Sequence, residues 1–94
     1  MAHRIIKRGD IIAMRRALEG GLDPNLTNRF GWTLLMLAAL HGRSDFAQLL
    51  IASGADPTRK NKFGDSPSSL AAHKGFVHLS SALDHASVTH NAEV

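Results

Sequence analysis

The chain repeats itself with a period of 33 residues. The segment Gly21–Pro24 returns as Gly54–Pro57, and Leu37–Ala39 returns as Leu70–Ala72. A fixed period of this length is typical of a stacked array, in which each short unit buries its apolar face only against its neighbours. Such an array builds an extended binding surface more readily than a catalytic pocket.

Each period predicts a helix, a turn, a second helix and an extended loop. In the middle period Thr33 is suited to be an N-cap, because its hydroxyl can accept from a free N–H group of the first helical turn. In the last period Ser66 has the same place, and Pro67 suits the first helical position. The expected helices are residues 5–8, 11–19, 34–40, 44 or 45 to 53, 67–74 and 77 to about 83, and residues 56–64 are expected to form a loop.

The pattern changes at the end of the third period. Asp84 lies where the equivalent Ile51 predicts an apolar residue, and Ser87 lies where the pattern predicts a glycine. Asp84 is therefore expected to mark the polar edge at which stacking ends, and residues 87–94 are expected to form a frayed tail. The expected architecture is one all-α domain at residues 1–86, with repeats at about 1–20, 21–53 and 54–86, of which the first and last act as caps.

Composition narrows the class of protein. The 94 residues include no cysteine, which excludes a disulfide framework, a thiolate zinc site and a cysteine nucleophile. No apolar run approaches the roughly 20 residues of a membrane-spanning helix, and the N-terminus lacks the apolar core of a signal peptide. We therefore expect a soluble cytoplasmic protein. The net charge of +3 is mild, and it fits either a solvated surface or a bias toward acidic partners.

The segment Gly31–Ala39, followed by Gly42, Leu49-Leu50 and Gly54–Asp56, resembles an ankyrin repeat. The family pattern is Gly-x-Thr-Pro-Leu-His-x-Ala-Ala, then Gly, then Leu-Leu, then Gly-Ala-Asp, and the resemblance covers about residues 4–86. It implies an α-solenoid of about three helix-turn-helix repeats, whose loops project as β-hairpin fingers. It also implies a protein without catalytic activity that binds other macromolecules through the finger tips and the concave face of the first helices.

This chain departs from the family pattern in both complete repeats. In the middle repeat Leu34 and Met36 replace the proline and the histidine, and in the last repeat Ser68 and Ser69 replace the leucine and the histidine. The family histidine usually ties neighbouring loops together by hydrogen bonds. Its replacement therefore affects the expected rigidity of the loops and not the expected fold.

The resemblance also implies which positions contact a partner. On the fingers they are the two residues before the repeated glycine and the one after it, and on the inner helices they are the two residues before the next glycine. In this sequence the fingers supply Arg29, Phe30, Trp32, Lys62, Phe63 and Asp65, and the inner helices supply Lys7, Arg8, Leu40, His41, His73 and Lys74.

Three aromatic residues of this set have two interpretations each. Trp32 is a solitary tryptophan on a finger, which is typical of an interface anchor, but it can also pack against Leu34 or Leu26 within its own loop. Phe30 and Phe63 recur at the same place in neighbouring fingers, which favours a structural contact between the fingers over partner binding.

The basic residues of the inner row and of the fingers, which include Arg59 and Lys60, together suggest a groove for an acidic peptide. The alternative is an ordinary solvated surface. Nucleic acid is a weaker alternative, because it usually requires a stronger excess of positive charge than +3.

Cofactors, metals and catalysis are not expected. None of the six histidines pairs with another at i, i+4, and no nucleophile motif surrounds any serine. Ser66, Ser68 and Ser69 are explained as cap and first-turn residues.

The N-terminal end offers a second kind of interface. Ile6 and Ile12 place large apolar side chains near the open end of the stack, where they either form an oligomer interface or fold inward against Met14 and Leu18. The sequence as a whole therefore predicts a non-enzymatic protein-binding module. The alternatives are a homo-oligomeric building block and, with less support, a nucleic-acid-associated protein.

Overall fold

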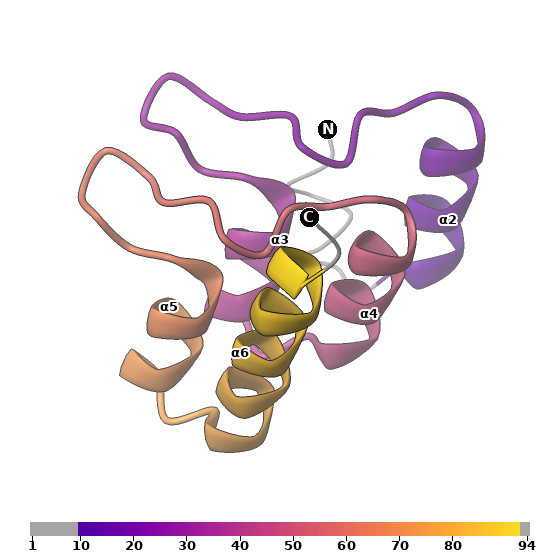
Figure 1. Cartoon of the computed structure of the whole chain (residues 1–94). Helices are drawn as coiled ribbons and strands as arrows, with labels where there is room; N and C mark the ends of the chain where they lie inside the picture. Colours follow the sequence, from indigo (N-terminus) through magenta and orange to yellow (C-terminus); the bar gives the residue numbers. More distant parts are fainter. Residues whose placement is uncertain (1–9, 93–94) are drawn as a thin grey trace.

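The structure is a computed structural model that describes residues 10–92, with side chains described to Val88. Five helices are described (Figure 1): α2 (Ile11–Glu19), α3 (Leu34–Leu40), α4 (Ser44–Ala52), α5 (Pro67–His73) and α6 (Val77–Ala92). Helix α3 packs on α4 and on α5, α5 packs on α6, and α2 packs on α4. The inner row is therefore α3 and α5, and the outer row is α2, α4 and α6. The predicted helix at residues 5–8 lies outside the described residues.

The inner helices begin at the predicted caps. Thr33 Oγ1 accepts from the backbone N–H of Met36 at 3.2 Å, and Met36 Sδ accepts from the N–H of Thr33 at 3.4 Å. Ser66 Oγ accepts from the N–H of Ser69 at 3.2 Å, and Ser69 Oγ accepts from the N–H of Ser66 at 2.8 Å. Because each cap satisfies two N–H groups that would otherwise lack a partner, the residues that replace the family histidine still order the start of their helices.

The core lies between the two rows of helices. Its largest fully buried side chains include Met14 from α2, Leu35 and Met36 from α3, and Phe46 and Leu50 from α4. Alanines 38, 39 and 71 on the inner helices are buried as well. Their small side chains allow the close helix packing that the apolar segments of the sequence predicted.

Two long loops project from the helices as fingers and lie side by side in Figure 1. We define the first finger as residues 20–33 and the second as residues 53–66. In each tip one asparagine side chain holds the turn. Asn28 Oδ1 accepts from the N–H groups of Phe30 and Trp32, at 2.9 and 3.1 Å. Asn61 Oδ1 does the same for Phe63 and Asp65, at 2.9 and 3.0 Å.

The C-terminal helix is longer than the sequence pattern predicted. It was expected to end near Leu83 and to be followed by a frayed tail, but α6 continues to Ala92. The physical reason is the missing glycine: Gly54, with φ of 101°, follows the end of α4, whereas the equivalent position in α6 is Ser87. Without a residue that favours left-handed backbone, the helix has no local signal to end there.

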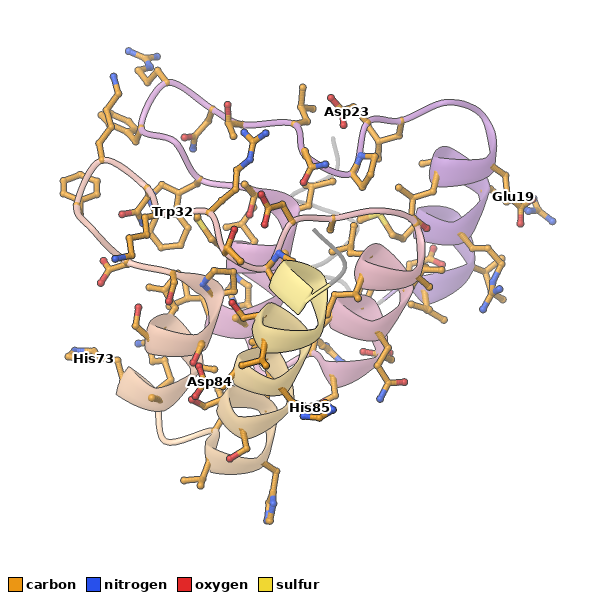
Figure 2. All side chains as sticks on the ribbon, viewed as in Figure 1. Glu19, Asp23, Trp32, His73, Asp84 and His85 are labelled. Carbon is orange, nitrogen blue, oxygen red and sulfur yellow. The ribbon has the colours of Figure 1, made fainter. Side chains whose placement is uncertain are left out.

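The prediction that Asp84 marks a polar edge agrees with its contacts. Asp84 is exposed, and Figure 2 shows it on α6 where this helix passes α5. Ser68 Oγ donates to Asp84 Oδ1 at 2.5 Å, and Ser80 Oγ donates to the carbonyl oxygen of Ser68 at 3.1 Å. The equivalent residues of the middle repeat are the apolar Leu35, Ala47 and Ile51. The last repeat therefore has a hydrogen-bonded polar cluster where the middle repeat has a stacking face.

Candidate functional site

The tips of the two fingers present an aromatic pair to solvent. The ring centroids of Phe30 and Phe63 lie 6.2 Å apart with the planes tilted by 32°. The two residues remain 48% and 69% exposed. The predicted contact between neighbouring fingers is therefore present, and it leaves most of the second ring free for another molecule. Partner binding by this pair stays a prediction.

Backbone contacts fix the two tips to each other. The N–H of Lys62 donates to the carbonyl oxygen of Phe30 at 2.9 Å. Gly31 lies so close to the second finger that a Cβ atom there would be 3.2 Å from Asn61 Cα and 3.3 Å from Lys62 N. Glycine is therefore required at position 31 both for its φ of 80° and for this close approach.

A second link joins the fingers at their bases. Asn25 Nδ2 donates to the carbonyl oxygen of Gly54 at 3.1 Å, and the N–H of Asp56 donates to Asn25 Oδ1 at 2.7 Å. The fingers are thus bonded to each other at base and tip, so their relative position is determined before any partner arrives.

Positive charge surrounds the aromatic pair. Arg29 Cζ lies over the Phe30 ring, 5.7 Å from its centroid, which is within range of a cation–π interaction. Lys60 and Lys62 are exposed on the second finger. Arg59 pairs with Asp56 at 3.8 Å, between Arg59 Nε and Asp56 Oδ2. We call Arg29, Phe30, Lys60, Lys62 and Phe63 the fingertip surface.

Two predicted finger residues are less accessible than this surface. Trp32 is half-buried and packs against the hydrophobic core, and Figure 2 shows it beside the fingers. Asp65 is also half-buried. Part of the Trp32 side chain is therefore in contact with the core, and the role of Trp32 as a binding anchor stays a prediction.

The predicted inner row is divided in character. Leu40 is half-buried and packs against the core, whereas His41, His73 and Lys74 are exposed. Figure 2 shows His73 pointing away from the helices. Lys7 and Arg8, which would extend the row, lie outside the described residues. The described part of this row thus has three exposed polar side chains, and the basic groove that the sequence suggested stays a prediction.

The remaining sequence predictions concern the N-terminal end and metal binding. Ile12 is 63% exposed, so in this structure it does not fold inward, and Ile6 lies outside the described residues. Across residues 10–92, no cluster of three or more histidine, aspartate or glutamate residues could hold a metal ion. None of the described helices has the length and apolar character to cross a membrane.

A groove between α4 and α6 was missed by the sequence analysis. It has a volume of about 510 Å³, and its walls include Ile51 and Ala52 from α4 and Ala82 and Ala86 from α6. Small side chains form part of its walls, among them Ala82 and Ala86 from α6. A groove of about 390 Å³ between α2 and α4 includes Leu49, the residue equivalent to Ala82, so the repeat pattern alone does not predict which pair of outer helices leaves the larger groove.

Comparison with known proteins agrees with this architecture. The family model described as ankyrin repeats (3 copies) matches residues 2–92. The 2-5A-dependent ribonuclease of Mus musculus is 38% identical over 69 residues, which are 72% of this chain and 9% of that protein. Ankyrin repeat family A protein 2 of Mus musculus is 34% identical over 76 residues, which are 81% of this chain and 24% of that protein. M-phase phosphoprotein 8 of Rattus norvegicus is 39% identical over 74 residues, which are 77% of this chain and 9% of that protein.

The chain spans less than a quarter of the length of these relatives. The likeness to proteins named as enzymes is therefore a likeness to their ankyrin-repeat regions alone. Ankyrin repeats are protein-interaction modules and are generally not catalytic. On the family match over residues 2–92, together with the paired helices and fingers, this chain belongs to the ankyrin-repeat family.

Proposed function

We propose that this chain is a non-enzymatic protein-interaction module of the cytoplasm, acting as an adaptor, an inhibitor or an assembly subunit. Its partner binds to the fingers and to the exposed ends of the inner helices. The observation that carries this proposal is the fingertip surface, where Phe30 and Phe63 are exposed on two loops that are bonded to each other. Exposed aromatic residues on a rigid support favour binding, because little conformational entropy is lost when the partner docks.

The test is capture of the partner from a lysate of the source organism with the wild-type chain and with Phe63→Ser. The matched control is Val88→Ser, because Val88 on α6 is 67% exposed and Phe63 is 69% exposed. Both variants remove an exposed apolar side chain and should leave the melting temperature nearly unchanged. A partner that binds the wild type and Val88→Ser but not Phe63→Ser supports the fingers as the binding surface. Equal capture by all three proteins would contradict it.

Trp32 requires a separate comparison, because it also packs against the core. Trp32→Phe keeps an aromatic side chain in contact with the core, and Trp32→Ala removes it. If Trp32 is a binding anchor, Trp32→Phe should weaken partner binding while the melting temperature stays near that of the wild type. If its role is packing, Trp32→Ala should lower the melting temperature, and the protein that remains folded should still bind.

Self-association is the second candidate function, favoured by the 63% exposure of Ile12 near the N-terminal end. Exposed apolar side chains at the end of a repeat stack favour contact with another copy. Sedimentation velocity over a range of concentrations tests it. An oligomer that dissociates in Ile12→Ser and persists in Val88→Ser would support this function, and a monomer at all concentrations would rule it out.

A further inference from the structure

Basic side chains gather at the tips of the two fingers. Four of the 11 lysine and arginine residues lie in the tips at residues 28–31 and 59–64, and neither tip contains an acidic residue. The whole fingers, residues 20–33 and 53–66, also contain Asp23, Asp56 and Asp65, so four cations and three carboxylates leave them at +1. The excess of positive charge is therefore local to the tips.

Most of this charge is available to a partner. Arg59 is paired with Asp56, but no ion pair between described residues involves Arg29, Lys60 or Lys62. All three are exposed. Exposed cations that form no ion pair within the described part of the chain attract carboxylates and raise the rate at which an acidic partner associates.

The same surface also offers an apolar contact. The Phe63 ring touches Phe30, yet Phe63 is 69% exposed. An apolar side chain of a partner that packed against the two rings would remove both from water.

Single-stranded nucleic acid would use cations and aromatic rings too, but the geometry favours a protein segment. The Phe30 and Phe63 rings are in contact and tilted by 32°, so no base can insert between them. The four cations at the tips are fewer than the roughly 6–10 phosphate contacts of a typical nucleic-acid complex.

We propose that the fingertip surface binds an acidic segment of a partner protein, with carboxylates against Arg29, Lys60 and Lys62 and one apolar side chain against the Phe30–Phe63 pair. This inference rests on the proposed function, because it specifies what kind of partner the fingers take. The bonds between Lys62 and Phe30 and within each tip hold the backbone from which these side chains project in place before binding.

The test is selection of peptides from a displayed random library with the full chain as bait. Three further baits are a charge variant (Arg29→Gln, Lys60→Gln and Lys62→Gln together), Phe63→Ser, and the control Arg16→Gln, which removes one exposed cation from α2, away from the fingers and the inner helices. Wild type and Arg16→Gln should enrich the same acidic peptides with one aromatic or large aliphatic residue. The charge variant should bind these peptides about tenfold more weakly, which corresponds to about 0.5 kcal/mol for each of three exposed ion pairs. Phe63→Ser should still enrich acidic residues but lose the preference for an apolar one.

The outcomes separate this inference from the proposed function. Suppose that the selected peptides bind the wild type but not Phe63→Ser, and that they show no excess of acidic residues. This result would support the fingers as the binding surface and would contradict the inference that the bound segment is acidic. Peptides that bind all four baits equally would contradict both. A labelled single-stranded oligothymidine that binds more tightly than the selected peptides, and loses binding in the charge variant, would assign the surface to nucleic acid.

Discussion

The backbone N–H of Lys62 lies 2.9 Å from the carbonyl oxygen of Phe30, and this hydrogen bond joins the tips of two fingers that are one repeat apart in the sequence. Gly31 allows the two backbones to come close enough for this bond, because a side chain at this position would press against the backbone of Asn61 and Lys62. The arrangement of the fingertip surface therefore depends on a residue that has no side chain of its own.

The contribution of this close approach can be isolated by comparing Gly31→Ala with Gly64→Ala. The two glycines are equivalent in the repeat and have φ values of 80° and 83°, but a Cβ atom at Gly64 would meet nothing within 4 Å. Gly64→Ala should cost about 1–2 kcal/mol of unfolding free energy from the left-handed backbone alone. Gly31→Ala should cost about 1–3 kcal/mol more, because the backbone of the second finger must move. Equal shifts of the denaturant midpoint for the two variants would show that the close approach at Gly31 does not contribute to the free energy of unfolding.

Asn25 should stabilise the bases of the fingers. Asn25→Ala removes the donor to Gly54 and the acceptor for Asp56, and we expect a loss of about 1–2 kcal/mol, since one hydrogen bond contributes about 0.5–1.5 kcal/mol. The amide proton of Asp56 should also exchange faster with solvent. Thr27→Ala, an exposed position of the same finger, is the control and should change neither quantity. Unchanged exchange at Asp56 in Asn25→Ala would contradict the link.

Leu50 and Leu26 should differ strongly on truncation. Leu50 is fully buried in the core, and Leu26 is 51% exposed on the first finger. Leu50→Ala should therefore cost about 2–5 kcal/mol of unfolding free energy, from lost burial and the cavity that remains. Leu26→Ala should cost well under half of that amount. Chemical denaturation followed by far-ultraviolet circular dichroism measures both. Similar losses would mean that the burial described for the two leucines is wrong.

The polar cluster at the C-terminal end should keep the stack from extending. Replacing Ser68, Ser80 and Asp84 by the middle-repeat residues Leu, Ala and Ile restores an apolar stacking face at that end. An uncovered face of this kind favours self-association. The triple variant should therefore form larger species than the wild type at the same concentration in sedimentation velocity. Ser81→Leu, an exposed position of α6, is the control for added apolar area. The prediction fails if the triple variant and the wild type sediment alike.

The candidate site shows where sequence reasoning stopped. The 33-residue register placed Phe30 and Phe63 at equivalent positions and predicted their contact, because equivalent loops of stacked repeats are neighbours. The same register could not decide how far Trp32 is buried, since that depends on how the loop folds back onto the core. It also missed the groove between α4 and α6, which depends on the spacing of two helices that are not adjacent in the sequence.

The sequence by itself determined the repeat, the all-α architecture and the helix starts at Thr33 and Ser66, because periodicity and capping are local properties that residues a few positions apart carry. The tertiary structure decided which residues of the fingers remain exposed and how the fingers are joined. Those properties arise from contacts between residues about one repeat apart, such as Lys62 with Phe30 and Asn25 with Gly54. The length of α6 is a local property instead: Ser87 lies where the repeat pattern has a glycine, and the helix continues to Ala92.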